Sequence, residues 1–67
     1  MIKQQVGERI KILRRKLGIS QEELADRAEI HRTYIASLEV GKRNVSIITL
    51  EKVVNALEVS LSDFFNF

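Results

Sequence analysis

Two short stretches gather most of the polar side chains that could make specific contacts with a partner molecule. The first opens with Arg32, Thr33 and Tyr34 and continues to Ser37, and the second is the run 42–44, Lys-Arg-Asn. An arginine guanidinium can donate two hydrogen bonds to guanine O6 and N7, and threonine offers a hydroxyl and a methyl group to base edges. Lys, Arg and Asn in a loop are typical phosphate contacts. These types favour contact with nucleic acid, and the alternative is a solvated helix face.

The sequence offers few residues that could form a catalytic or metal-binding site. The chain has no Cys and one His, so it can form neither a disulfide nor an all-protein zinc cage. His31 lacks the Ser, Cys or second His of a triad, and we expect it at a helix start or beside a phosphate. The carboxylates occupy exposed helix positions without a paired partner or a nucleophile. We therefore predict no enzyme activity, no metal, no cofactor and no small-molecule ligand.

Charge is divided unevenly along the chain. Residues 1–43 carry ten basic and six acidic residues, a balance of +4, whereas residues 44–67 carry one basic and three acidic residues, a balance of −2. This asymmetry favours a polyanion-facing N-terminal part and an apolar or self-associating C-terminal part, and solvated helix faces are the alternative. The run Arg14-Arg15-Lys16 is interpreted as a solubilising surface rather than a binding patch.

Length and hydropathy predict one small domain spanning residues 1–67. Of the 67 residues, 45% are hydrophobic, which is ordinary for a globular domain. A domain this short buries only about 60% of its unfolded surface, so dimerisation is the obvious source of extra core. The longest apolar run has three residues, 34–36, against the roughly 20 that a membrane span requires. We expect no membrane span and no signal-peptide core.

Periodicity and capping signals predict five helices and no strands. Apolar residues recur every three or four positions from Ile2 to Leu17, and Gly18 follows as a C-cap. Ser20 and Glu23 fit a capping box that starts a short second helix and satisfies two N–H donors.

The later boundaries follow from the same signals. A third helix over about 32–40 ends at Gly41, and Ser46 caps a fourth whose apolar face begins at Ile47 and reaches Leu57. Ser60 and Asp63 (S-x-x-D) fit a capping box for a final turn with Leu61, Phe64 and Phe65.

The second and third helices, about residues 20–40, have the dimensions of a helix-turn-helix. In that motif the first helix braces across the DNA backbone and the second lies in the major groove. Ala25 falls where the two helices touch, so only a small side chain fits, and Ile30, Ile35 and Leu38 point into the core. The outward positions are Arg32, Thr33, Ala36 and Ser37, with Tyr34 at the edge.

With these residues in place, the chain resembles the Cro/cI-type (Xre) helix-turn-helix regulators. The resemblance is carried by Ser20-Gln21-Glu22-Glu23-Leu24-Ala25, by Arg32-Thr33-Tyr34-Ile35 and by Leu38-Glu39-x-Gly41-Lys42-Arg43-Asn44. The Arg-Thr-Tyr-Ile opening and the Arg43-Asn44 loop are also similar to controller proteins of restriction-modification systems. The resemblance implies an all-α five-helix bundle of the lambda-repressor-like type, a homodimer on a pseudo-palindromic operator, and a cytoplasmic, nucleoid-associated repressor or activator of bacterial or phage origin.

The resemblance and the outward positions together give the predicted DNA contacts. They are Gln21, His31, Arg32, Thr33, Tyr34, Ala36, Ser37, Lys42, Arg43 and Asn44. In activating members of the family an acidic patch touches RNA polymerase, and Glu22 and Asp26 occupy the matching face. The alternative for this pair is a solvated surface near the positive end of the helix.

Three positions depart from the usual family pattern. Glu29 replaces the common turn Gly, so a residue with a Cβ is expected at positive φ, at a cost of roughly 1 kcal/mol. His31 stands where Ser, Thr or Asp usually caps the recognition helix, and Val45 stands where Pro often precedes the next helix.

Three aromatic residues fall in the last four positions, more than so small a core should hide. We therefore predict a dimerisation region over about 46–67. Its predicted interface residues are Val59, Leu61, Phe64, Phe65 and Phe67. The competing function class is an antitoxin-like or other protein-interaction module, which would lack salt-dependent DNA binding.

Overall fold

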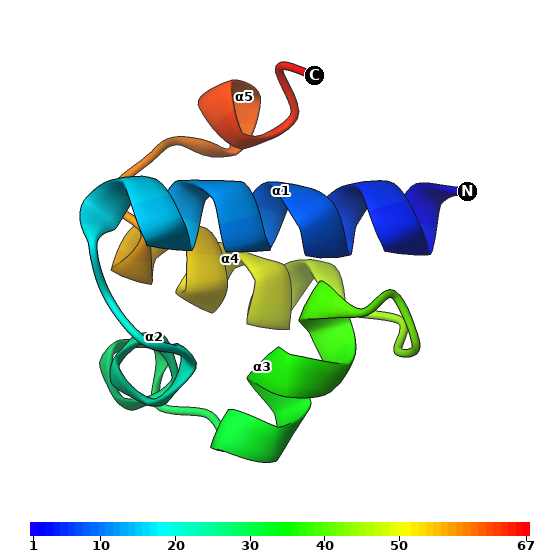
Figure 1. Ribbon diagram of the computed structural model, residues 1–67. Helices are drawn as coiled ribbons and strands as arrows, with labels where there is room; N and C mark the ends of the chain where they lie inside the picture. Colours follow the sequence, from blue (N-terminus) through cyan, green and yellow to red (C-terminus); the bar gives the residue numbers. More distant parts are fainter.

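Five helices and no strands make up the chain, as predicted. The computed structural model describes all residues, 1–67. The helices are α1 (Ile2–Leu17), α2 (Gln21–Ala28), α3 (Arg32–Glu39), α4 (Ile47–Ala56) and α5 (Leu61–Phe64). In Figure 1, α1 crosses the middle of the molecule, with α5 above it and α2, α3 and α4 below. No helix is both long and apolar enough to cross a membrane.

The predicted helix ends are largely confirmed. Gly18 follows α1 with φ 77° in the left-handed region. The Oγ atoms of Ser20, Ser46 and Ser60 each accept a hydrogen bond from the backbone N–H three residues on, at 3.0, 3.1 and 3.0 Å. The reciprocal half of the Ser20 capping box is absent, because the Glu23 carboxylate pairs with Arg27 at 2.8 Å instead. That part of the prediction is wrong, since a charged partner one turn away on the same helix competes for the carboxylate.

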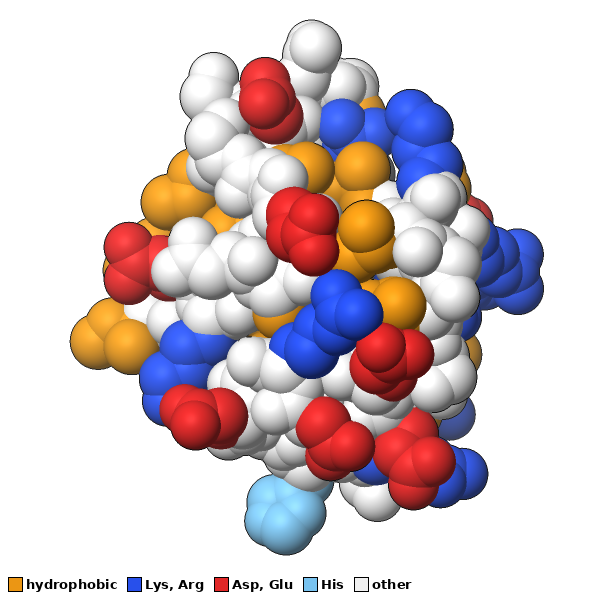
Figure 2. Space-filling model, turned by 90° about the vertical axis from the view of Figure 1, so that its left-hand side faces the viewer, with side chains coloured by type: hydrophobic (Ala, Val, Ile, Leu, Met, Phe, Trp, Pro, Cys, Tyr) orange, Lys and Arg blue, Asp and Glu red, His pale blue; other side chains and the backbone are white.

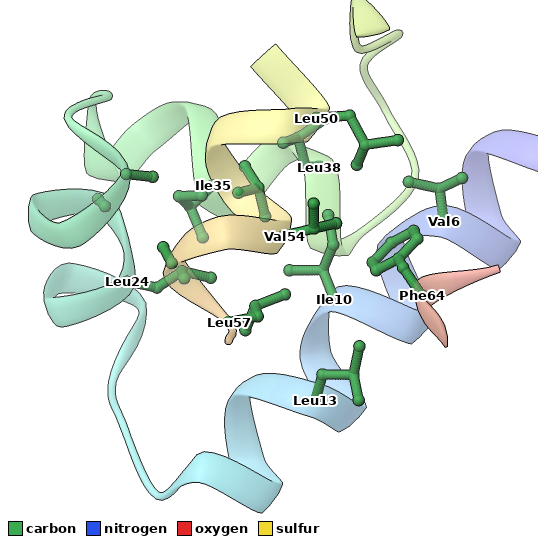
Figure 3. Packing of buried hydrophobic residues seen from close by; sticks show 14 of the residues in the cluster. Val6, Ile10, Leu13, Leu24, Ile35, Leu38, Leu50, Val54, Leu57 and Phe64 are labelled. Carbon is green, nitrogen blue, oxygen red and sulfur yellow. The ribbon is translucent and has the colours of Figure 1, made fainter. Parts of the chain in front are cut away.

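One core gathers side chains from all five helices (Figure 3). Ile10, Leu24, Ile35, Val53 and Phe64 are fully enclosed in it. The prediction that Ile47 belongs to the buried face of α4 is wrong, because its side chain is 66% exposed. Ile47 is the first residue of α4, and the buried face of this helix begins three residues later, at Leu50.

A close approach between α1 and α3 depends on a glycine that the apolar periodicity did not reveal. Gly7 is buried within α1. A Cβ at this position would collide with the Leu38 carbonyl oxygen and lie 2.9 Å from that of Glu39. Glycine therefore lets α1 press against the backbone at the end of α3.

Candidate nucleic-acid interface

The turn between α2 and α3 fixes the orientation of α3, the predicted recognition helix. Glu29 has φ 59° and ψ 43°, so the predicted left-handed conformation is confirmed. The Ile30 N–H then donates to the Ala25 carbonyl at 3.0 Å and closes the turn. Ala25, Ile35 and Leu38 are buried as predicted, and Ile30 packs against the core while partly exposed. The buried face of α3 is thereby fixed, and its opposite face is turned to solvent.

The start of α3 carries no side-chain cap. His31 is the N-cap residue, is exposed, and makes no capping hydrogen bond, as its residue type predicts. The backbone N–H groups of Arg32 and Thr33 have no acceptor within the protein. Unpaired N–H groups at a helix start can donate to a phosphate.

Gln21 and Arg32 come together beside this helix start. Both line a small hollow without hydrophobic residues, together with Arg14, Ser20 and Glu22. The Arg32 side chain is 66% exposed and lies 3.5 Å from Glu22, which is a weak surface pair. Arg32 can therefore leave Glu22 for another acceptor at little cost in free energy.

The loop after α3 folds back onto the recognition helix. The Arg43 Nε donates to the Ser37 Oγ at 3.0 Å, and the guanidinium lies 4.8 Å from the centre of the Tyr34 ring. The Tyr34 hydroxyl donates to the Asn44 carbonyl at 3.3 Å, while the Ser37 hydroxyl donates to the Tyr34 carbonyl at 2.8 Å. Arg43 thus places its charge against α3, closer to the helix than its loop position suggested.

The remaining predicted contact residues differ in how accessible they are. Thr33, Lys42 and Asn44 are exposed, whereas Ala36 and Ser37 are half-buried. A second hollow, beside the first half of α3, includes His31, Thr33, Tyr34 and Arg43 in its lining. The structure therefore divides the predicted residues into a Gln21 and Arg32 group and a group around Tyr34 and Arg43.

A buried ion pair next to the first group was not predicted. Arg14 donates to both carboxylate oxygens of Glu39, at 2.6 and 3.1 Å, and to the Ile19 carbonyl at 2.9 Å. The Glu39 side chain is 1% exposed, and its Oε1 also accepts from the Gln21 Nε2 at 3.0 Å. The hydrogen bond to Glu39 raises the pKa of Arg14 above its usual value, and partial burial opposes that rise.

This pair corrects the interpretation of Arg14 as part of a solubilising run, because its guanidinium joins α1 to the end of α3 and to the loop before α2. A signal for Glu39 existed in the sequence. It follows Ile35 by four positions and Leu38 by one, so it falls on the buried stripe of α3.

Acidic side chains gather at the level of α2 on the face shown in Figure 2. Glu23 and Glu58 both pair with Arg27, at 2.8 and 3.4 Å, and Glu22 pairs with Arg32. Asp26 is exposed and forms no ion pair. Much of this acidic surface is therefore balanced by arginines of the same chain.

The C-terminal aromatic residues divide between the core and the surface. Phe64 is 0% exposed, so its prediction as an interface residue is wrong: its ring fills the protein's own core between α1 and α4. Phe65 and Phe67 are 42% and 57% exposed, and Val59 and Leu61 are half-buried.

Phe65 also borders an apolar surface that was not predicted. The hydrophobic residues of this surface, called here the apolar groove, are Ile2, Val6, Val45, Ile47, Leu50 and Phe65. It joins the first turn of α1 to the first turn of α4 and the end of α5.

Comparison with known proteins gives a consistent set of matches. Residues 10–64 match the family model described as helix-turn-helix (HTH_3). The control protein C.MunI of a Mycoplasma species is 44% identical over 66 residues, which cover 97% of this chain and 89% of that protein.

Solved structures with the same arrangement include two restriction-modification controller proteins. C.AhdI from Aeromonas hydrophila superposes with a TM-score of 0.91 at 35% identity, covering 94% of this chain and 96% of that one. C.Esp1396I, solved as a tetramer in complex with its natural 35 base-pair operator, gives 0.92 at 38% identity, covering 97% and 86%.

Proposed function

This chain belongs to the HTH_3 helix-turn-helix family, and from that premise we propose that it is a transcriptional regulator that binds double-stranded DNA sequence-specifically. The observation that carries the proposal is the seating of α3. Ala25 and the left-handed Glu29 hold its apolar face in the core, which leaves Arg32 and Thr33 free to enter a major groove. We place its function in recognition and not in catalysis.

The DNA contacts are assigned from exposure and chemistry. We assign the exposed Arg32 and Thr33 to base edges. Ala36 and Ser37, both half-buried, belong to the same outward face of α3, and Tyr34 lies at its edge. Gln21 and His31 lie at the starts of α2 and α3, where phosphates bind, and the loop residues Lys42, Arg43 and Asn44 contact the backbone on the other side.

A restriction-modification controller is the more specific role that we propose. Its support is the similarity to C.MunI and C.AhdI over nearly the whole chain, together with the operator-bound tetramer of C.Esp1396I. We propose that this chain binds a pseudo-palindromic operator as a homodimer, in the cytoplasm and associated with the nucleoid.

The apolar groove is the face that we assign to the homodimer. Ile2, Ile47 and Phe65 are well exposed there, and the polar residues Lys3, Arg43 and Asn44 complete the lining of the groove. Exposed apolar surface of this kind is typical of protein contacts. Val59, Leu61 and Phe67 lie in or next to α5 and extend the contact, whereas Phe64 supports it from inside the core.

Selection of bound sequences from a random duplex pool tests this proposal. We expect enrichment of a two-fold symmetric site, with affinity that falls steeply with salt because the protein displaces counterions from phosphates. A protein-interaction module, the competing function, would show neither. Absence of both enrichment and salt dependence would therefore overturn DNA binding as the function.

Contact with RNA polymerase is a further part of the proposal and concerns Glu22 and Asp26. Both are exposed on α2, and Asp26 has no partner within the chain. We expect Asp26→Lys to abolish transcription activation in vitro while operator affinity is kept. Glu51→Lys, an exposed exchange on α4, is the matched control. Full activation by the Asp26 variant would reject the contact.

A further inference from the structure

Arg9 makes the only side-chain hydrogen bonds that join α1 to α5. Its Nε donates to the Phe64 carbonyl at 2.8 Å, and its second terminal nitrogen donates to the Asp63 carbonyl at 2.8 Å. These groups are more than fifty positions apart along the chain. Arg9 is half-buried between the two helices and has no carboxylate partner.

The helix that receives these bonds cannot stand alone. α5 has four residues, fewer than an isolated helix needs in water. The last carbonyls of any helix lack partners within it, and a cation there is favourable. The planar guanidinium can donate to two carbonyls at once, which a lysine ammonium does less well because it is a point charge.

The bonds of Arg9 fix the backbone directly before Phe65. The Phe65 ring packs edge-on against the buried Phe64, with ring centres 5.1 Å apart, and borders the apolar groove. Phe64 anchors α5 in the core because its ring is fully buried. The Phe65 ring is 42% exposed, so the core does not fix its orientation in the same way.

We propose that Arg9 is a positioning residue for self-association, which it promotes by holding the end of α5 so that Phe65 faces the apolar groove. This inference rests on the proposed homodimer. Without Arg9 the last turn of α5 frays and the Phe65 ring samples several directions, so dimer formation must order it again.

The test is the dimer dissociation constant of the full chain, measured by sedimentation. We expect Arg9→Gln to weaken dimerisation by up to about tenfold, the scale of ordering one side chain on association. Arg15→Gln removes the same charge from an exposed position of α1 and should leave the constant unchanged. If Arg9→Gln does not fold, Arg9→Lys, which keeps the charge but not the fork, replaces it in the comparison.

Combining the Arg9 variant with Phe65→Leu separates positioning from general stability. If Arg9 acts through Phe65, the dissociation constant of the double variant rises clearly less than the two single fold-changes multiplied together. Two results would overturn the inference and leave the homodimer in place. One is a double variant whose fold-change equals the two single fold-changes multiplied together, and the other is an Arg9 variant that dimerises like wild type. A wild-type chain that stays monomeric at tens of micromolar would overturn the homodimer itself.

Discussion

At the scale of single residues, Glu29 has a side chain at a position that favours glycine. Its φ of 59° brings the Cβ close to the backbone, at a cost of roughly 1 kcal/mol. Glu29→Gly removes this strain but increases the entropy of the unfolded chain. We expect a net gain in stability of a few tenths to about 1 kcal/mol in urea denaturation.

A matched exchange in a helix should have the opposite sign. Glu51 is exposed within α4, where φ is negative, so Glu51→Gly should lower the free energy of unfolding by roughly 1 kcal/mol. A Glu29→Gly variant that loses stability as Glu51→Gly does would show that unfolded-state entropy exceeds the strain.

Two arginines should contribute differently to DNA binding. Arg32 lies at the start of α3, and losing a bidentate base contact there should cost about 1–3 kcal/mol per half-site on the operator. Arg43 lies beside Tyr34 and Ser37, where a phosphate is the nearer target. We expect Arg32→Ala to narrow the affinity gap between operator and random DNA, and Arg43→Ala to preserve it while reducing the salt slope by about one per protomer.

Both variants and an Arg15→Ala control can be compared on the two duplexes across a salt series. Equal proportional losses on operator and random DNA for Arg32→Ala would mean that Arg32 holds the backbone. Base recognition would then fall to Thr33, Tyr34 or Ser37, which lie on the same helix.

At the scale of helices, the Arg14 and Glu39 pair joins α1 to the end of α3. Glu39→Ala leaves the guanidinium, 12% exposed, without its carboxylate, and we expect a loss of about 3–5 kcal/mol in urea denaturation. Glu22→Ala removes an exposed partner of Arg32 and should cost less than about 1 kcal/mol. Similar losses for the two variants would mean that the buried pair adds nothing beyond a surface pair.

Helix positions followed from the sequence because their signals are local. The spacing from Ile2 to Leu17, the left-handed Gly18 and the serine caps depend on neighbours within one or two turns. The exposed positions of α3 followed for the same reason, since Ile35 and Leu38 set which face is buried.

Contacts between distant segments did not follow in the same way. Glu39 is buried because Arg14 reaches it from 25 positions away, and Gly7 matters because the Leu38 backbone comes close to it. Phe64 and Phe65 have the same residue type, and only the packing of α5 sends one into the core and leaves the other outside. Residue type and local spacing therefore do not predict which residues far apart in the sequence will contact each other.

At the scale of the whole molecule, the proposed DNA-binding and dimer surfaces meet at one loop. Arg43 and Asn44 line the apolar groove as well as the surface beside α3. Dimer formation at the groove would therefore enclose one side of the loop that contacts DNA. This arrangement links the spacing of the two recognition helices to the geometry of the dimer.

Phe65→Glu tests the location of this interface. The variant should fold, because Phe65 is 42% exposed, but it should sediment as a monomer, since dimer formation would remove water from a carboxylate among apolar side chains while Arg43 is already held by Ser37 and Tyr34. Operator affinity should fall by about 10²-fold or more, because two linked half-sites bind far more tightly than one. Arg15→Glu places a carboxylate at an exposed position of α1 that lines neither the apolar groove nor the hollow beside Phe67, and it should dimerise like wild type. A Phe65→Glu variant that still dimerises would overturn the apolar groove as the interface, and the groove would then need a different occupant.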